Sequence, residues 1–484
     1  MNRAPTSPVG GNDEQKRHAQ SPFAWTTKFF EATTRRLAPV IAACALLAAC
    51  GESQPVPTLT LKAPRAIEWN DFLGVNAQFH WFPPEVYKRQ MQTLHALGLS
   101  WVRLGLQWEL LEPEPGKFRY DVLDPIMQAM RDNSLKPEVY LVGSARFATT
   151  APADAREFRD QYPPRDADEY ARTLAGLAQR YPDVAAWQVW NEPNLPGFWR
   201  PHEDPDGYAR LFVASAKALH AAVQDKPIVL GGFAYFGEMG VLGGSMIDAM
   251  DARGLVSHKN ANTPLADIEP PVVAYHPYTL YPEGNRTTSR EFVEKTRALN
   301  ARLRMLGATR IWADEWGWSS YAGPKEEQPI IGADGQADFL LRRLALMSTL
   351  DFDRIFLFTL SDLDTRASVR DRNYGLLDLD AQPKPAYLAL QRFLAITGPR
   401  LEPADAPTLT DPPSGLIGIA WTRADGHRLL MFWAADTGEA KLAQVAHATL
   451  HDPLAGTQRD LAAGADGALQ VPVTRRLALL EWTP

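Results

Sequence analysis

The chain has 484 residues, of which 45% are hydrophobic and 22% are charged, values that exclude a disordered or collagen-like protein. Its formal net charge of −7 provides no basic excess for binding the phosphates of nucleic acids. The only two cysteines, Cys44 and Cys50, lie close to the N-terminus, so we expect neither a disulfide framework nor a cysteine metal cluster in the folded part.

The N-terminal residues have the pattern of an export signal. A polar stretch ends at Arg35 and Arg36, and an apolar run of 13 residues follows from Leu37 to Ala49. This run is shorter than the ~20 residues that a membrane-spanning helix needs. It has the length of the hydrophobic region of a secretory signal. We therefore predict that residues 1–49 are a signal segment and that the protein is exported.

The end of this run, Leu47-Ala48-Ala49-Cys50, resembles a bacterial lipobox. The resemblance implies cleavage before Cys50, lipidation of its thiol, and contact with a membrane through the lipid anchor only. Gly51 follows the cysteine in place of Asp, which favours the outer membrane. A plain signal that ends in an Ala-x-Ala-like site is the alternative, and it would give a periplasmic protein. Residues 50–70 are then expected to form a tether and an N-terminal strand.

From residue 71 onward, short β-like runs alternate with amphipathic helical patterns, which predicts a parallel sheet. Eight such units over 71–398 fit a (β/α)8 TIM barrel. A doubly wound open sheet is the alternative, but no phosphate-binding glycine fingerprint follows the first strand. The predicted strands are 71–79, 100–106, 136–142, 185–192, 227–233, 271–278, 309–316 and 353–362, and the predicted helices include 84–97, 167–180, 205–223, 289–306, 337–350 and 384–396.

The pattern changes after Thr397-Gly398-Pro399. Short β-like runs divided by Gly, Asp and Pro predict a small antiparallel β-sandwich over 399–484. Residues 58–68 also alternate, and we predict that they pair with this C-terminal sheet or close the floor of the barrel. The runs in the sandwich are 415–422, 427–434, 441–450, 468–473 and 477–482.

Two glutamates stand at the ends of predicted barrel strands, where a barrel carries its function. Glu192 ends the fourth strand and Glu315 ends the seventh, and each has a Trp close by. Either one alone would be read as a surface charge, but together they form the pair that glycosidic bond cleavage requires. Glu192 would be the acid/base, and Glu315 would be the ionised nucleophile, held by donors such as Arg103, His276 or Tyr278.

This set of residues resembles glycoside hydrolase clan A. The resemblance rests on Trp190-Asn191-Glu192-Pro193 and on Glu315-Trp316-Gly317, with Arg103 and the His276-x-Tyr278 pair. It implies a retaining mechanism and a hydrogen bond from Asn191 to the 2-hydroxyl of the sugar. Trp101-Val-Arg103, Trp108-Glu109 and the sandwich most resemble family thirty-nine, which includes β-xylosidases, α-L-iduronidases and endoglycosidases of Psl-type exopolysaccharides.

One residue departs from the clan pattern, because the eighth strand carries Phe358 where the clan usually has Trp. Aromatic rings at strand ends can stack on the face of a sugar, so Trp199 and Trp318 are candidates for this role or for ordinary packing. His80 is a candidate for contact with a sugar hydroxyl or for a structural role. Arg366, Arg370 and Arg372 form a basic cluster that is either a solvated loop or a contact for an acidic sugar.

The sequence therefore predicts a retaining β-glycoside hydrolase that acts on a polysaccharide or oligosaccharide and needs no cofactor. No HExxH motif or cysteine pair points to a metal. Long predicted loops at the barrel mouth favour an endo-acting enzyme on a bacterial exopolysaccharide, and we expect a monomer. The alternatives are an exo-acting β-xylosidase-like enzyme, a transglycosylase that uses the same residues, and a non-catalytic carbohydrate-binding lipoprotein.

Overall fold

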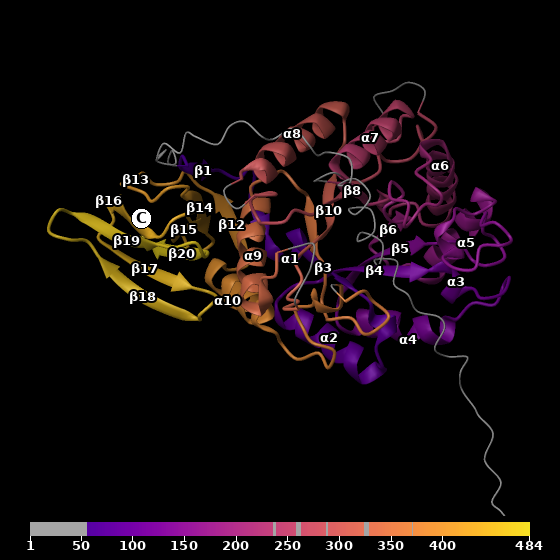
Figure 1. The fold of residues 1–484 in the computed structure, drawn as a ribbon, viewed down its shortest axis with the longest axis horizontal. Coiled ribbons are helices and arrows are strands. Elements are labelled where there is room, and N and C mark those ends of the chain that lie inside the picture. The colour runs from indigo at the N-terminus through magenta and orange to yellow at the C-terminus, as the bar shows by residue number, and fades with distance from the viewer. Residues whose placement is uncertain (1–55, 236–238, 258–262, 287–288, 324–328, 370) are drawn as a thin grey trace, which may run out of the picture.

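The computed structural model describes residues 56–484, except 236–238, 258–262, 287–288, 324–328 and 370. This part of the chain forms a barrel surrounded by helices and, at its C-terminal end, a pair of antiparallel sheets (Figure 1). The predicted signal segment 1–49 and the predicted lipidation site Cys50 lie outside the described residues, so both stay predictions.

The barrel confirms the predicted (β/α)8 fold. Its parallel strands follow one another in the order β7-β6-β5-β4-β3-β11-β10-β9-β8. Val229 of β7 also bridges to Val272 just before β9, so the sheet closes on itself and is not an open doubly wound sheet. The strands are β3 (Leu73–Ala77), β4 (Trp101–Gln107), β5 (Lys136–Val142), β6 (Ala186–Val189), β7 (Ile228–Leu230), β8 (Phe233–Tyr235), β9 (Val273–Pro277), β10 (Ile311–Trp316) and β11 (Arg354–Leu357).

Gly231 and Gly232 divide the fifth barrel strand into β7 and β8. The first half pairs with β6 and the second half with β9. Gly232 has a φ of +52°, in the left-handed region that favours glycine. The division therefore lets one strand bend between its two neighbours while the barrel stays closed.

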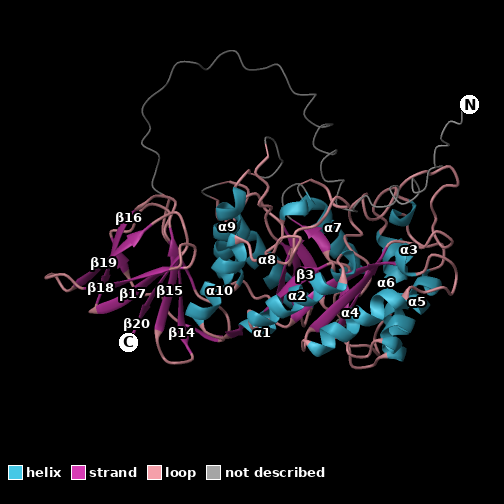
Figure 2. Cartoon of the chain, turned by 90° about the horizontal axis from the view of Figure 1, so that it is seen from below, coloured by secondary structure: helices cyan, strands magenta, loops and turns pink. Residues whose placement is uncertain are grey.

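Helices cover the outside of the barrel (Figure 2). Asp166 begins α5 by accepting a hydrogen bond from the backbone of Asp168, and Asp204 begins α6 in the same way. The helix predicted at 337–350 begins earlier, at Gly332. The helices are α1 (Trp69–Phe72), α2 (Pro84–Ala96), α3 (Trp108–Leu111), α4 (Tyr120–Asp132), α5 (Ala167–Arg180), α6 (Pro205–Ala222), α7 (Met239–Ala252), α8 (Glu291–Leu306), α9 (Gly332–Met347) and α10 (Pro385–Thr397).

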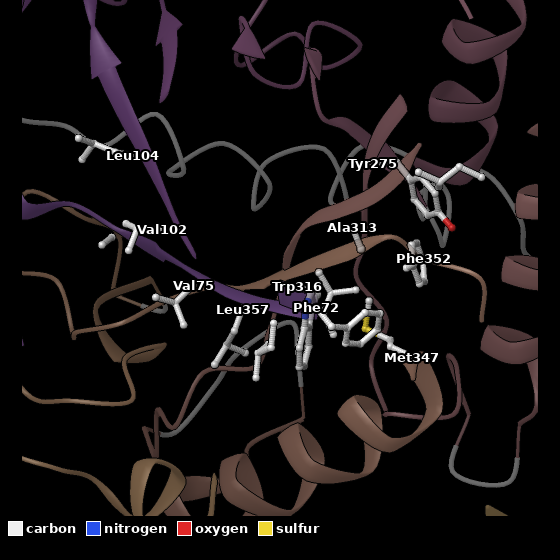
Figure 3. Packing of buried hydrophobic residues seen from close by; sticks show 14 of the residues in the cluster. Phe72, Val75, Val102, Leu104, Tyr275, Ala313, Trp316, Met347, Phe352 and Leu357 are labelled. Atoms are coloured by element: carbon white, nitrogen blue, oxygen red, sulfur yellow. The ribbon is translucent and has the colours of Figure 1, made fainter. Parts of the chain in front are cut away.

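Each barrel strand places alternate side chains outside and inside. The outward side chains of β3, β4, β10 and β11 pack with residues of the surrounding layer, as Figure 3 shows for Val75, Val102, Ala313 and Leu357. The inward side chains form an apolar floor and, nearer the carboxyl ends of the strands, a polar layer. The floor consists of Trp101, Ala186, Val229, Val272, Ala274, Trp312 and Phe356.

The C-terminal residues form two antiparallel sheets, which confirms the predicted sandwich. The larger sheet has the order β18-β17-β20-β15-β14-β12-β2, and the smaller has the order β13-β16-β19. Their strands are β12 (Arg400–Pro403), β13 (Leu409–Thr410), β14 (Ile417–Arg423), β15 (Arg428–Trp433), β16 (Gly438–Ala443), β17 (His447–Asp452), β18 (Thr457–Ala462), β19 (Ala468–Val473) and β20 (Ala478–Trp482).

The N-terminal strands join this larger sheet, as predicted for residues 58–68. Strand β1 (Leu59–Leu61) pairs parallel with β14, and β2 (Ile67–Glu68) pairs antiparallel with β12. The single strand predicted at 441–450 is wrong, because a turn divides it into β16 and β17, which lie in different sheets. Strand β18 has almost fully exposed side chains and so lacks the apolar alternation that predicts a strand.

The larger sheet packs on both faces. Ile417, Ile419 and Trp421 of β14 belong to the core shared with the barrel, whereas Ala420 belongs to the core between the two sheets. Trp433 Nε1 also donates a hydrogen bond of 2.8 Å to Glu283 Oε1 in the loop after β9. Within the described residues, the search for a helix long and apolar enough to cross a membrane finds none.

Candidate active site

The turn after β6 places Glu192 at the barrel mouth. Trp190 and Glu192 both have left-handed backbones, with φ of 70° and 44°, which costs about 1–3 kcal/mol at each residue. The surrounding backbone holds this turn, because the Glu192 amide lies 2.9 Å from the carbonyl oxygen of Gly231 and 3.1 Å from that of Gly232. The strain is therefore balanced by contacts that aim the carboxyl group of Glu192 into the barrel.

A β-bulge in β10 brings two consecutive acids to the site. Ala313 pairs with Ile355 and Trp316 pairs with Leu357, so three steps along β10 match two along β11. In a regular strand Asp314 and Glu315 would point to opposite faces. The extra residue re-aims one of them, and both carboxyl groups reach the same imidazole.

That imidazole belongs to His276, on β9. Its Nδ1 lies 2.7 Å from Glu192 Oε1 and 2.9 Å from Glu315 Oε2. Its Nε2 lies 3.4 Å from Asp314 Oδ1. His276 is therefore the centre on which three carboxyl groups converge, one from the turn after β6 and two from β10. The sequence predicted only that it would hold Glu315.

The surroundings set the protonation states of these groups. Burial raises the pKa of Glu192, and the charge of Glu315 raises it further against the opposing effect of His276. Burial alone would lower the pKa of His276, but Glu315, Asp314 and Glu192 together hold it well above the ordinary value. Burial would raise the pKa of Asp314, but His276 and Arg103 lower it. The site thus favours the protonated form of both Glu192 and His276.

Arg103, on β4, holds the polar layer together. It donates from Nε to Gln188 (2.9 Å), from Nη1 to Asn76 (2.9 Å) and from Nη2 to Asn191 (2.6 Å). Its Nε also lies 3.6 Å from Asp314 Oδ2. Because the guanidinium is fully buried, these contacts fix the Asn191 side chain and balance the charge of Asp314.

The spacing of the two glutamates distinguishes between mechanisms. One oxygen of Glu192, one oxygen of Glu315 and one nitrogen of His276 all lie within 4.8 Å of one another. A retaining glycosidase places its carboxyl groups ~5–5.5 Å apart, whereas an inverting one needs ~6.5–9.5 Å for a water molecule. The same spacing would also suit a metal ion.

An aromatic wall continues from the carboxyl groups along the barrel mouth. The rings of Phe358 and Tyr374 meet edge to face at 5.4 Å, and Tyr278 meets Tyr374 in the same way at 6.5 Å. Trp81 packs against this group. Burial and the nearby charge of Glu315 raise the pKa of Tyr278 well above the ordinary value. The structure thus places the predicted residues Tyr278 and Phe358 together beside the glutamates.

His80 lies in the same region, next to Trp81. Its Nδ1 is buried and has no hydrogen-bond partner in the described part of the chain. Burial and the charge of Arg366 lower its pKa to about 4, so the ring is neutral. A neutral imidazole with a free nitrogen can exchange a hydrogen bond with a hydroxyl group, which agrees with the role proposed for His80.

Trp199 and Trp318, predicted either to stack on a sugar or to pack in the core, are both buried. Trp199 is buried, with its ring edge to face against Trp190 at 5.2 Å and against Tyr208 at 5.9 Å. Trp318 is buried too, and its Nε1 donates to the carbonyl oxygen of Leu280 at 3.1 Å. Because both residues come just after barrel strands, a place at the barrel mouth was expected. The loops that carry them fold back and bury both rings in the core.

Two of the three arginines of the predicted basic cluster, Arg366 and Arg372, are among the described residues, and Arg370 lies outside them. Arg366 pairs with Asp364 at 2.7 Å and lies over the ring of Trp81 at 4.5 Å. Arg372 donates to the backbone oxygen of Ala367 at 3.0 Å. These two arginines therefore brace the loop after β11 beside the aromatic wall.

Several residues of the polar layer were not predicted. Asn76, Gln188 and Asp314 surround Arg103, and Tyr140 lies under its guanidinium at 4.1 Å. The sequence did contain a signal for this polar layer. Glu138 and Tyr140 are polar residues at alternate, inward positions of strand β5, which is otherwise mostly apolar. A polar side chain in a buried barrel strand needs a partner, and Asn76, Gln188 and Asp314 are partners of Arg103, whereas Glu138 accepts no hydrogen bond among the described residues.

The comparisons with known proteins agree with this geometry. Residues 77–153 match the model of a family described as beta-galactosidase. Beta-galactosidase BgaA from a Thermus species is 30% identical over 140 residues, which are 24% of this chain and 21% of that protein. The chain thus spans about a fifth of the length of the curated relatives that it matches.

Solved structures show the fold over most of the chain. A family 39 glycoside hydrolase from Bacteroides cellulosilyticus WH2 is 18% identical and has a TM-score of 0.63, with 86% of this chain and 82% of that chain covered. A monomeric beta-xylosidase from Caulobacter crescentus CB15 is 15% identical and has a TM-score of 0.58, with 88% and 99% covered. The resemblance in fold to clan A glycoside hydrolases, family thirty-nine among them, is confirmed.

Proposed function

We propose that this protein is a retaining β-glycoside hydrolase. The observation that carries the proposal is the pairing of Glu192 and Glu315 around Nδ1 of His276, with oxygens within 4.8 Å of each other. Burial raises the pKa of Glu192, as a general acid requires, and Glu315 Oε2 lies 2.9 Å from Nδ1 of His276.

The reaction follows from these positions. Glu192 donates its proton to the leaving oxygen while Glu315 attacks the anomeric carbon and forms a glycosyl-enzyme. Glu192, now a carboxylate, then accepts a proton from water, which releases the sugar with retained configuration. Asn191, whose Oδ1 accepts a hydrogen bond from Arg103 Nη2, is the residue that we propose binds the 2-hydroxyl group of the sugar.

The substrate that we propose is a bacterial exopolysaccharide cut within the chain. Long segments between the strands and helices support this, as do the aromatic rings beside the glutamates. A second candidate is an exo-acting β-xylosidase-like enzyme. It is favoured by the enclosure of the catalytic groups, because Glu315 is 1% exposed and Glu192 is 6% exposed.

One set of digestions tests these proposals. The purified protein is incubated with bacterial exopolysaccharide and with aryl β-glycosides, and the products are sized and their anomeric configuration is followed by NMR. A first-formed β-anomer and a range of oligosaccharides are expected. Only monosaccharides would favour the exo-acting enzyme, and products longer than the substrate would indicate transglycosylation. A non-catalytic carbohydrate-binding protein would cleave none of these substrates, and Glu192→Gln and Glu315→Gln would leave the cellular phenotype intact.

We further propose that the protein is an exported monomer, anchored in the outer membrane through a lipid on Cys50. The Leu47-Ala48-Ala49-Cys50 segment supports the anchor. Labelled palmitate should enter the wild-type protein and not Cys50→Ser, which should be released from the membrane fraction. Labelling of both variants, or of neither, would contradict the anchor. Size-exclusion chromatography of Cys50→Ser tests the monomer.

A further inference from the structure

One acid inside the barrel takes no part in the chemistry proposed above. Glu138 lies on β5, where its neighbours in register are Arg103 on β4 and Ala186 on β6. Its side chain points into the barrel between the apolar floor and the polar layer and is 0% exposed. A charged carboxylate at such a position is costly unless it is paired and hydrogen-bonded.

Neither requirement is met for Glu138. Both of its carboxyl oxygens are buried without a hydrogen-bond partner among the described residues. The closest cations are engaged elsewhere, since Arg103 donates to Gln188, Asn76 and Asn191. Arg354 donates to the side chain of Asp71 at 2.6 Å and lies over the ring of Trp101. A buried carboxyl group without donors is stable as the neutral acid, which then has a proton to donate.

An acceptor for that proton lies nearby, since Asp314 Oδ2 is 3.6 Å from Nε of Arg103, the neighbour of Glu138 in register. Asp314 Oδ1 is buried and has no hydrogen-bond partner in the described part of the chain, and its 3.4 Å contact with His276 Nε2 is longer than a normal hydrogen bond. Asp314 Oδ2, in contrast, accepts from Gln188 at 2.7 Å. The charges that act on Glu138 are those of Asp314, Arg103, Arg354 and His276, with Asp314 the strongest.

We propose that Glu138 is a positioning residue, a neutral carboxylic acid that donates its proton to Oδ1 of Asp314 and so holds Asp314 against His276. His276 in turn contacts both Glu192 and Glu315. Glu138 therefore acts on these two glutamates through Asp314 and His276. Burial and the charge of Asp314 raise the pKa of Glu138 to about 8, which agrees with a neutral group at pH 7. The kinetic part of this inference rests on the proposed glycosidase function.

Infrared spectroscopy tests the proton without any need for activity. In a Glu192→Gln background, the spectrum at pH 7 should contain the carbonyl stretch of a protonated carboxyl group, and Glu138→Gln should remove it. Glu112→Gln is the matched control, because Glu112 is also buried but accepts from Trp108 Nε1 at 2.7 Å. A spectrum that Glu138→Gln does not change would show that Glu138 is ionised and would overturn the proposal, whether or not the protein cleaves glycosides.

Kinetics test the positioning role. Glu138→Gln keeps a neutral donor and should retain kcat within a few-fold, whereas Glu138→Leu should lower kcat about tenfold to a hundredfold with little change in KM. The fall of kcat at high pH should be steeper in the wild type, where Glu138 and Glu192 both lose protons, than in Glu138→Gln. If Glu138→Leu does not fold, the pH profile of kcat for Glu138→Gln tests the positioning role instead. Equal kcat in all three proteins, or equal pH profiles for wild type and Gln, would overturn the role.

Discussion

Glu192 and Glu315 meet at a single nitrogen atom, because Nδ1 of His276 lies 2.7 Å from one carboxyl group and 2.9 Å from the other. The two glutamates come from strands β6 and β10 on different sides of the barrel. Their shared contact with an imidazolium stabilises a carboxylate at either position. This relationship leads to the first prediction, which assigns different roles to the two residues.

Replacement of either glutamate should abolish most of the activity in distinguishable ways. Glu192→Gln removes the proton donor and should lower kcat about 10²- to 10⁴-fold, least for substrates with good leaving groups. Glu315→Gly removes the nucleophile, and azide should restore turnover by attacking from the vacated space. Steady-state rates with aryl glycosides of different leaving-group pKa measure both effects. Azide rescue of Glu192→Gln but not of Glu315→Gly would mean that the nucleophile was misassigned.

Arg103 should matter for both stability and rate. Arg103→Met leaves Asp314 with only His276 as a buried cation, which should cost about 3 kcal/mol in the free energy of unfolding. Arg103→Lys keeps the charge, but one ammonium group cannot reach Gln188, Asn76 and Asn191 together. We expect Arg103→Lys to have a free energy of unfolding closer to that of the wild type than Arg103→Met has. Its kcat should nevertheless be lower than wild type by about tenfold or more. Urea unfolding and kcat measured on the same samples separate these effects, and wild-type kcat in Lys would contradict the role of the hydrogen bonds.

Gly232 should be sensitive to the smallest side chain. A Cβ atom there would lie 2.6 Å from His276 Nε2 and 2.7 Å from Asp314 Oδ2, both parts of the buried centre. Gly232→Ala should therefore lower kcat as well as stability. Gly98→Ala is the control, since Gly98 also has a positive φ but nothing lies within 4 Å of its Cβ position. The control should lose about 1 kcal/mol of stability with kcat unchanged, and an equal loss of kcat in both would contradict the argument.

The pH dependence of stability should report on Glu138 directly. Its pKa rises from an ordinary value near 4.5 to about 8 on folding, so between these values the folded state binds more protons than the unfolded state. Stability therefore falls as pH rises through this window, by up to about 1.4 kcal/mol per pH unit, and the fall ends above pH 8. Glu138→Gln lacks this contribution, and its stability relative to wild type should grow from pH 5 to pH 8. Urea unfolding at several pH values measures the difference, and parallel curves would contradict it.

Much of this molecule was predictable because the relevant signals are local. Each of the eight predicted barrel strands is present, and the predicted segment from Lys136 to Val142 is strand β5. Glu192 and Glu315 could be identified because each lies at or just beyond the carboxyl end of a buried strand, and parallel strands present these ends at one mouth. The same logic placed Arg103, His276 and Tyr278 near them. Periodicity and strand order are properties of the chain itself, so the sequence contained this information.

Other features depend on contacts between distant segments. The bulge in β10 that brings Asp314 and Glu315 to one imidazole arises from pairing with β11, and it leaves no mark on the sequence of β10. Trp199 and Trp318 stand near strand ends like sugar-binding rings, yet the fold buries them. The neutral state of Glu138 also depends on which groups surround it. The sequence by itself determined the barrel, the sandwich and the pair of glutamates, whereas only the tertiary structure decided which buried groups carry protons, because protonation depends on distance and burial.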